Sequence, residues 1–396
     1  MPRNVWVLSG ISLSVAIGFG VVAPVLPMFA ASFGVNEMAA GAVISAFALM
    51  RLVFAPAVGR LDDRLGHRAV LTSGILIVAV SSVLTGFAQN YPQLIILRGL
   101  GGVGSAMFSV AGMTVLLASV DAAHRGRASG LYQGGFLVGA VIGPAIGGLF
   151  GGISLRAPFF FYAGTLAVAA TVGLFLTPVA VAGRGREGAP GAGQHRRPLS
   201  QVLRDWRFIA ACGANLTQGW NSNGTRSTLV PLFIAGYLAG SEEQASLWTG
   251  VAMAVAAAVQ IAVVMPAGWA VDRYGRRVPM VAGALVAGAA LAFFPWSGAI
   301  VPLTALMCVY AVGSALLGTA PSAAVGDAAG PGGDRAIAIY SMAGDTGSVV
   351  GPLVAGFLAQ HVSYPVAFAV GAVLWFGSAG LSSRLPTTHG GAAGQS

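Results

Sequence analysis

Charge is scarce in this sequence, and lysine is absent from it. Charged residues make up 8% of the 396 positions, and all 21 basic side chains are arginine. Soluble proteins carry roughly 25% charged residues, so this composition excludes a water-soluble globular domain. Apolar runs of roughly 20 residues, the length that crosses a bilayer, recur along almost the whole chain, which is 56% hydrophobic. The sequence therefore predicts an all-α polytopic membrane protein.

Motifs of enzymes and of ATP-driven machines are missing as well. The two cysteines, Cys212 and Cys308, both lie inside apolar runs and form neither a disulfide framework nor a metal-binding pattern. There is no Gly-x-Ser-x-Gly, no His-Glu-x-x-His and no phosphate-binding loop. Gly99, Gly101 and Gly104 fit Gly-x-Gly-x-x-Gly, but no strand precedes them, which excludes a dinucleotide site. We expect no enzymatic activity, no catalytic residues, no cofactor and no metal.

The apolar runs predict twelve transmembrane helices. Their limits are 5–31, 39–59, 69–88, 94–120, 128–151, 158–178, 208–236, 247–270, 280–297, 302–326, 336–359 and 365–382. With the N-terminus in the cytosol, only Arg156 falls in an outer loop, and the other loop arginines lie inside, as the positive-inside rule requires. Both termini are therefore predicted to be cytoplasmic in a multi-pass protein of the cell (inner) membrane. We expect a monomer that contacts membrane lipids and binds no nucleic acid.

A stretch rich in Gly, Arg and Pro divides the spans into two groups of six. We predict an N-terminal six-helix bundle over 1–180, a cytosolic linker over 181–207, a C-terminal six-helix bundle over 208–384 and a cytosolic tail over 385–396. The linker is predicted to end in a short interfacial helix that turns Leu203, Trp206 and Phe208 toward lipid. Its arginines either bind anionic headgroups or only set the topology.

The two halves repeat one another. GRLDDRLGHR at 59–68 matches GWAVDRYGRR at 268–277 with an offset of 209 residues, and VIGPAIGG at 141–148 aligns with VVGPLVAG at 349–356 with an offset of 208. RASGLY at 127–132 and RAIAIY at 335–340 share the offset of 208. A duplicated unit of this kind is typical of secondary transporters, whose substrate site lies at mid-membrane between the repeats.

Glycine recurs every fourth residue in the fifth predicted span. The positions are Gly135, Gly139, Gly143, Gly147 and Gly151. On a helix this spacing makes a stripe without side chains, which lets another membrane helix approach closely. Pro144 interrupts the hydrogen-bond ladder there, and neighbouring helices can compensate for that in a membrane. The stripe is either a general packing face or a functional seam.

These motifs resemble those of the major facilitator superfamily, and within it the twelve-span drug:proton antiporters of the multidrug and vesicular-amine branch. The superfamily's loop motif stands here as Gly59, Leu61, Asp63, Arg64, Gly66, His67 and Arg68, with His67 in place of the usual Arg. The second copy keeps Gly268, Asp272, Arg273, Gly275, Arg276 and Arg277. The fourth-span motif stands as Arg98, Gly102 and Gly104, with Gly101 where Gln is usual. The antiporter motif of the fifth span is complete, with Gly130, Gly139, Gly143, Pro144, Gly147 and Gly148.

The resemblance implies two pseudo-symmetric six-helix bundles and a cytosolic gate built on the loop motifs. Asp63 would face the start of span eleven near Ala336, and Asp272 would face that of span five near Ala128. Carboxylates stabilise helix N-termini, and Arg127 and Arg335 stand beside those termini. The alternative is that the motifs only set topology. The expected gate residues are Gly59, Asp63, Arg64, Gly66, Arg68, Asp272, Arg273, Gly275, Arg277, Arg127 and Arg335.

Ionisable residues inside membrane spans are functional candidates by default. Asp345 is the one acidic residue well inside a span. It lies roughly 15 Å up span eleven, and Arg51 lies roughly 18 Å up span two, at 1.5 Å per residue. We expect an Arg51–Asp345 ion pair that either couples transport to protons or only registers the two halves. In the family an arginine at the position of Arg98 is associated with proton coupling, whereas Arg226 is expected to be structural.

Amide side chains are the other polar groups inside the spans. Gln133, Asn215, Gln218 and Gln260 either line a substrate cavity or hydrogen-bond to neighbouring helices, each for roughly 0.6 kcal/mol. Span seven also carries Asn221 and Asn223. We predict a secondary transporter that exports a small lipophilic compound, the small-molecule substrate, in exchange for protons by alternating access. The alternatives are a metabolite or sugar transporter of the same fold, and a non-transporting receptor or lipid-handling protein.

Overall fold

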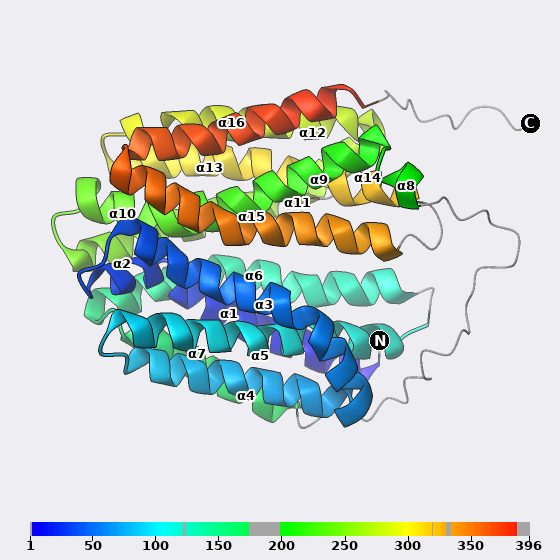
Figure 1. Ribbon diagram of the computed structural model, residues 1–396, viewed down its shortest axis with the longest axis horizontal. Helices are drawn as coiled ribbons and strands as arrows, with labels where there is room; N and C mark the ends of the chain where they lie inside the picture. Colours follow the sequence, from blue (N-terminus) through cyan, green and yellow to red (C-terminus); the bar gives the residue numbers. More distant parts are fainter. Residues whose placement is uncertain (1, 122–123, 174–198, 319, 330–333, 386–396) are drawn as a thin grey trace, which may run out of the picture. The chain divides into compact units, whose positions relative to one another are not determined.

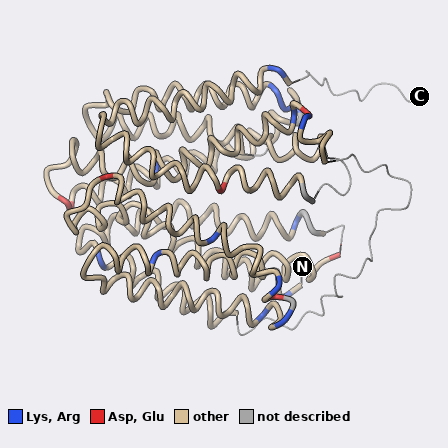
Figure 2. The backbone as a smooth tube through the Cα atoms, in the orientation of Figure 1, with Lys and Arg blue, Asp and Glu red and all other residues tan. Residues whose placement is uncertain are grey.

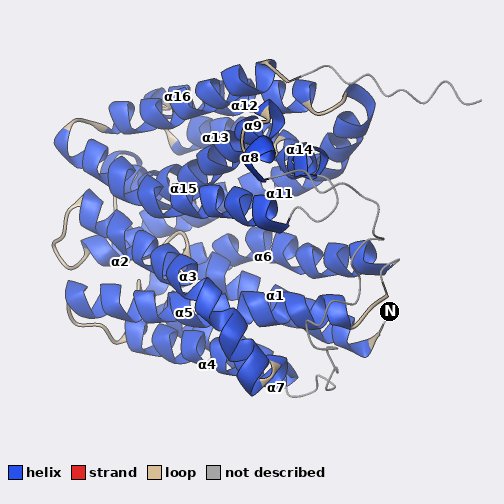
Figure 3. Cartoon of the chain, turned by 45° about the vertical axis from the view of Figure 1, so that its right-hand side comes forward, coloured by secondary structure: helices blue, strands red, loops and turns tan. Residues whose placement is uncertain are grey.

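The computed structural model describes residues 2–121, 124–173, 199–318, 320–329 and 334–385. These residues form helices and the turns between them, and no strand occurs in the described ranges (Figure 3). The all-α prediction is therefore confirmed. Figure 2 shows that most charged residues lie near helix ends, as the low charge of the spans requires.

Ten of the described helices are long and apolar enough to cross a membrane. The stretches are Arg3–Val22, Glu37–Asp62, His67–Gly86, Tyr91–Ala118, Arg127–Ile153, Glu242–Val271, Arg277–Trp296, Ile300–Gly326, Ala336–His361 and Tyr364–Ser383. The helix Ala157–Gly173 is apolar but shorter, and the next predicted span, 208–236, is divided into several pieces. The total of twelve spans and the orientation of the termini stay predictions.

The described chain divides into two compact units, Met1–Gly185 with Ser227–Ala254, and Arg186–Arg226 with Val255–Ser396. The helices of the first unit are α1 (Arg3–Val22), α2 (Leu26–Ala31), α3 (Glu37–Leu65), α4 (His67–Gly86), α5 (Tyr91–Ala118), α6 (Arg125–Ile153), α7 (Ala157–Gly173), α10 (Val230–Phe233) and the π-helix η3 (Ile234–Leu238). The second unit holds α8 (Leu199–Val202), α9 (Trp206–Gly219), α12 (Arg277–Phe293), η4 (Phe294–Trp296), α13 (Ile300–Leu316), α14 (Ala320–Ala329), α15 (Asp334–His361) and α16 (Tyr364–Ser383).

Two elements pass from one unit into the other along the chain. They are the π-helix η2 (Trp220–Leu229), which is divided after Arg226, and α11 (Glu242–Tyr274), which is divided after Ala254. The stretch 227–254 therefore groups with the first unit. The division into bundles over 1–180 and 208–384 stays a prediction.

The two units repeat the same neighbour relations (Figure 1). In the first unit α1 packs on α6, and α4 packs on both α5 and α7. In the second unit α9 packs on α15, and α12 packs on both α13 and α16. The sequence offset of about 208 residues relates these pairs to one another, so the internal repeat of the sequence is also a repeat of helix packing.

Short polar residues and glycines set the ends of several helices. The side chains of Asn36, Asn90 and Ser363 accept hydrogen bonds from the backbone N–H three residues ahead, which satisfies a donor at each helix N-terminus. Gly66 and Gly275 adopt φ values of +84° and +72°, a backbone conformation that glycine alone adopts without strain. Each loop motif therefore has a glycine where the chain turns: Gly66 alone separates α3 from α4, whereas Gly275 and Arg276 separate α11 from α12.

The start of the seventh predicted span differs from the expectation. Phe208 was expected to face lipid but is only 3% exposed, in a cluster with Val202 and Val325. Trp206 is half-buried, and its Nε1 donates to the Leu381 carbonyl at 2.8 Å. Burial is favoured because the apolar sides of α14 and α15 are available there. Only Leu203, 40% exposed, keeps an outward position.

The predicted span 208–236 consists of α9, η2, α10 and η3 rather than one regular helix. Its central segment WNSNGTRSTL forms the π-helix η2. Gly219, Gly224 and Pro231 weaken regular α-helical bonding, and π-helical turns are frequent at functional sites. This span is therefore the most irregular of the second half.

Candidate functional site

The glycine stripe of α6 packs closely against α1 in the first unit. A Cβ added to Gly143 would lie 2.6 Å from the Gly20 Cα, and one added to Gly139 would lie 2.7 Å from the Ala16 carbonyl carbon. A Cβ on Gly147 would lie 2.8 Å from the Val21 carbonyl carbon. Real Cβ atoms essentially never come this close to backbone. The stripe therefore exists to bring the backbones of α6 and α1 together.

A second face of α6 packs on the first half of α11. A Cβ on Gly250 would lie 2.6 Å from the Gly148 Cα, and one on Gly151 would lie 3.1 Å from the Ser246 Cβ. The Ser246 hydroxyl donates to the Gly148 carbonyl at 3.3 Å. Ser246 is fully buried. The antiporter motif thus supports two seams, and Gly148 belongs to the second of them.

One residue of the antiporter motif takes part in neither seam as described. A Cβ on Gly130 would meet nothing within 4 Å, and the same holds for Gly134 one turn further on. Pro144 lies in both neighbourhoods, since its ring faces Gly20 and its carbonyl faces Gly250. The proline therefore marks the level of α6 at which the α1 seam and the α11 seam come closest.

The second unit contains the equivalent of the α1–α6 seam, between α15 and the α9–η2 segment. A Cβ on Gly347 would lie 2.8 Å from the Trp220 backbone nitrogen, and one on Gly351 would lie 2.8 Å from the Trp220 Cα. A Cβ on Gly224 would lie 2.6 Å from the Gly351 carbonyl carbon. Gly347 and Gly351 correspond to Gly139 and Gly143 at the offset of 208. The close approach of two backbones is thus conserved between the two repeats.

Arg98 is a buried cation on α5. It is 3% exposed, and its guanidinium carbon lies 4.7 Å from the centre of the Phe47 ring of α3. Gly102, one turn further along α5, packs against the Phe47 carbonyl, so a larger residue there would push the two helices apart. Among the described residues the Arg98 Nε has no hydrogen-bond partner. The aromatic face supplies an attraction for the cation but leaves this N–H donor unused.

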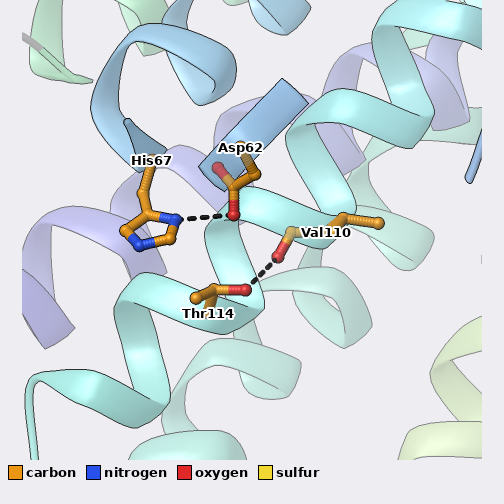
Figure 4. Close-up of polar contacts among 4 residues, drawn as sticks. All are labelled: Asp62, His67, Val110 and Thr114. Carbon is orange, nitrogen blue, oxygen red and sulfur yellow. Dashed lines mark hydrogen bonds and ion pairs between the residues drawn. The ribbon is translucent and has the colours of Figure 1, made fainter. Parts of the chain in front are cut away.

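The turn between α3 and α4 holds a pair that the sequence reasoning did not single out. The Asp62 Oδ2 lies 2.5 Å from the His67 Nδ1 (Figure 4). Asp62 is only 4% exposed, although it stands near a helix end. Two features of the sequence could have indicated the pair. His67 stands where the motif usually has Arg, and Asp62 is an acid at a position for which the motif specifies no residue.

Several of the remaining loop-motif arginines lie at the surface, whereas Arg276 and Arg277 are half-buried. Arg64, Arg68, Arg127 and Arg273 are exposed, and Arg273 stacks over the rings of Trp269 and Tyr274 at 5.1 and 5.8 Å. Gly59 has open space around its α-carbon. The side chains of Asp63, Asp272 and Arg335 lie outside the described part, so the latch stays a prediction.

The expected ion pair joins residues of the two different units. Arg51 is an exposed residue of α3, and Asp345 is a half-buried residue of α15. Both make polar interactions in the structure. Their pairing stays a prediction.

The amides of the seventh span mostly bind their neighbours in the second unit. Asn215 Nδ2 donates to the Tyr340 carbonyl at 2.8 Å, and Gln218 Nε2 donates to the Ser314 hydroxyl at 2.9 Å. Asn221 is fully buried and donates to the Thr217 and Gly371 carbonyls at 3.1 and 3.3 Å. These bonds support the second of the two readings, helix association, for Asn215 and Asn221.

Other polar residues of the spans have different surroundings. Gln133 is exposed and Gln260 is half-buried, so their role as cavity residues stays a prediction. Gln218 keeps a buried Oε1 without a partner among the described residues. Arg226 lines a small cavity with Thr225, Phe294 and Tyr310, and the cavity has room for about one water molecule. This cavity is too small for a substrate.

Two similar helical units, each with a glycine-lined seam between long apolar helices, define a membrane transporter built by duplication. The chain belongs to the major facilitator superfamily, because the model of that family matches residues 8–222 and 212–387. Membership makes the protein a transporter and not an enzyme, as the sequence predicted. The family assignment made from the loop and antiporter motifs is likewise confirmed.

Solved transporters share the fold over nearly the whole chain. A bacterial homologue of the human lysosomal transporter Spinster, crystallised in an inward-facing and occupied conformation, superposes with a TM-score of 0.75 at 14% identity, covering 96% of this chain and 95% of that one. The nucleoside transporter NupG (D323A mutant) superposes with a TM-score of 0.69 at 16% identity, covering 96% of this chain and 97% of that one. At these identities the likeness concerns the fold alone.

Curated relatives include drug-resistance proteins. The chain is 29% identical over 177 residues to the quinolone resistance protein NorA of Staphylococcus aureus (strain MRSA252), which covers 43% of this chain and 44% of NorA. It is 28% identical over 161 residues to multidrug resistance protein 2 of Bacillus subtilis (strain 168), 40% of each chain. The alignments therefore span less than half the length of these relatives.

Proposed function

We propose that this protein exports small lipophilic compounds across the cell membrane in exchange for protons. The observation that carries the proposal is the α6 helix, whose complete antiporter motif makes one glycine seam with α1 and a second with α11. The likeness to NorA and to multidrug resistance protein 2 supports an outward direction of transport. The substrate and the coupling ion are part of the proposal.

In this proposal the α6–α11 seam is the part that opens and closes. It is held by backbone proximity at Gly148 and Gly250 and by a single hydroxyl bond from Ser246. A seam of small residues gains from close packing but has no long side chains to disentangle, so it separates at low cost. The α1–α6 seam, which is longer, stays closed and keeps the first unit intact.

Proton coupling in this proposal depends on charges inside the spans. Asp345 takes up a proton when its predicted partner Arg51 moves away, and releases the proton when the pair forms again. Buried charges are costly unless they are paired, which ties protonation to conformation. Arg98 is a second buried cation, with a free N–H donor at Nε and the Phe47 ring over its guanidinium. In this proposal the Arg98 Nε donates a hydrogen bond to the substrate or to an acidic side chain during the transport cycle.

The loop motifs form the gate on the opposite side in the same scheme. Gly66 and Gly275 give each loop a residue with positive φ at its turn. Asp63 and Asp272 then face helix N-termini of the other repeat and hold the cytosolic side closed. Exposed Arg127 stands beside one of these termini. Rocking of the two repeats about the glycine seams alternates the two gates.

A disulfide across the α6–α11 seam tests whether this seam must open. A Cβ on Gly152 would lie 3.4 Å from the Glu243 Cγ, so Gly152→Cys/Glu243→Cys places two thiols side by side across the seam, and formation of the disulfide is measured by loss of free thiols. Cys212 and Cys308 are first replaced by Ala. We expect oxidation to stop dye efflux from cells and a reductant to restore it, while each single variant is unaffected by oxidation.

Full efflux from the fully oxidised double variant would refute the role of the seam. The direction and coupling are tested separately by measuring dye efflux with and without a protonophore in cells that make the unmodified protein. Efflux that stops with the protonophore supports proton coupling. Efflux that continues unchanged with the protonophore excludes proton coupling but still shows that the protein transports the dye.

A further inference from the structure

The Asp62–His67 pair joins a buried carboxylate to a histidine at the turn between α3 and α4. The Asp62 Oδ2 lies 2.5 Å from the His67 Nδ1, and the other oxygen of the carboxylate, Oδ1, is buried without a hydrogen-bond partner among the described residues. Figure 4 shows the pair over the turn of α5 that carries Val110 and Thr114. The Thr114 hydroxyl donates to the Val110 carbonyl at 2.9 Å. It is therefore committed to its own helix rather than to the carboxylate.

The second copy of the loop motif supplies an internal comparison. At the offset of 209 residues, Val271 stands in place of Asp62, and Arg276 stands in place of His67. The second turn therefore has a permanent cation and no acid at these positions. Both turns contain a glycine with positive φ, Gly66 or Gly275. At these two positions only the first turn carries side chains whose charge a proton can change.

Among the described residues of α3, α4 and α5, His67 is the only histidine. On its own helices the charged neighbours are Arg60, Arg64 and Arg68, all exposed, and Asp63, whose side chain lies outside the described part. On α5, which packs against both α3 and α4, Arg98 is the only charged residue, and the helix carries none from there to its end at Ala118. Histidine is the side chain that changes charge between about pH 5 and pH 8.

We propose that His67 is a proton-operated clasp on the turn between α3 and α4. When His67 is protonated, it neutralises the buried Asp62 carboxylate and holds the end of α3 against the start of α4. When it loses the proton, the carboxylate keeps one neutral hydrogen bond and one unpartnered oxygen, and the turn loosens. Acid therefore fixes the turn in the arrangement described here, and alkali releases it.

This clasp goes beyond the proposed function and rests on it for its physiological meaning. The turn carries the first loop motif, which in the proposed scheme gates the cytosolic side. An exporter driven by proton entry acidifies the cytosol, and acid closes the clasp. The pair would thus slow the transport cycle when the cytosol becomes acidic, independently of the proton that drives transport.

Thiol labelling of the turn tests the clasp without any transport. Leu65 is 60% exposed beside the pair, and Tyr274, its equivalent in the second copy, is 54% exposed. Leu65→Cys and Tyr274→Cys are made separately in a background in which Cys212 and Cys308 are replaced by Ala. The purified protein is labelled with a soluble maleimide at about pH 6 and at about pH 8, and the ratio of the two labelling rates removes the general effect of pH on thiol reactivity.

We expect the Leu65→Cys rate, relative to Tyr274→Cys, to rise several-fold from the lower to the higher pH. Adding His67→Arg, which copies Arg276, should make this ratio independent of pH. The double change Asp62→Val/His67→Arg gives the first turn both residues of the second turn. It should also make the labelling ratio independent of pH. An unchanged ratio in the unmodified turn, or the same rise with His67→Arg, would overturn the proposal.

Transport measurements then connect the clasp to function. In vesicles with a fixed pH difference across the membrane, lowering both pH values together should reduce efflux by the unmodified protein more than by His67→Arg. If efflux falls equally in the unmodified protein and in His67→Arg, while the labelling ratio still depends on pH, the clasp exists but does not control transport. Absence of any efflux would contradict the proposed function and not the clasp.

Discussion

The α1–α6 seam leads to a prediction whose size follows from the structure. Replacing Gly143 by Ala places a Cβ 2.6 Å from the Gly20 Cα, whereas ordinary contacts begin at 3.4 Å. The two backbones must therefore move apart by up to 0.8 Å, the difference of these two distances. Overpacking of this kind costs about 1–3 kcal/mol, while the higher helix propensity of Ala returns roughly 1 kcal/mol. The difference is a net destabilisation of up to about 2 kcal/mol.

The chain offers a matched control on the same helix. Gly134→Ala adds the same methyl group where nothing lies within 4 Å, so only the gain in helix propensity remains. The assay is thermal unfolding of the two purified variants in the same detergent, with the unmodified protein as reference. Gly143→Ala should unfold at a lower temperature than the reference, and Gly134→Ala at the same or a higher one. Equal unfolding temperatures for both variants would refute the reasoning that the stripe is a close-packed seam.

Three further substitutions test the polar residues. Arg98→Lys removes a planar cation from the Phe47 ring and should weaken that contact by about 1 kcal/mol. Dye efflux should fall, while the amount of folded protein measured by gel filtration stays unchanged. Asp345→Asn should abolish the dependence of efflux on the proton gradient, and retained dependence measured with a protonophore would remove this residue from the coupling scheme. Asn221→Leu leaves the Gly371 carbonyl without its donor and should cost about 1–3 kcal/mol in thermal unfolding, whereas Gln133→Leu, at an exposed position, should have no effect.

Spacing alone predicted the glycine face of α6, because every fourth residue of a helix lies on one side. It did not predict which helices would meet that side. Gly139 and Gly143 contact α1, whereas Gly148 and Gly151 contact α11, and a one-dimensional pattern carries no information on the partner. The internal repeat, by contrast, was visible in the sequence and reappears as equivalent packing of Gly347 and Gly351.

Polar residues were harder to assign from sequence. An amide in a span has two outcomes, a cavity wall or a bond to a neighbouring helix, and the choice depends on distances such as that from Asn215 to the Tyr340 carbonyl. Phe208 was expected to face lipid because lipid-facing and buried aromatic residues look the same in an apolar sequence. Asp62 was overlooked because acidic residues at span ends are usually solvated, and only the structure shows this one to be buried beside His67.

The central claim, export in exchange for protons, is tested most directly with the purified protein in liposomes. A pH gradient is imposed with the acidic side inside, and uptake of a lipophilic fluorescent dye is followed together with internal pH. The account predicts that the dye accumulates against its concentration gradient while the interior becomes less acidic, and that a protonophore stops both changes. Dye movement that only equilibrates across the membrane, with no change in internal pH beyond that of empty liposomes, would contradict it.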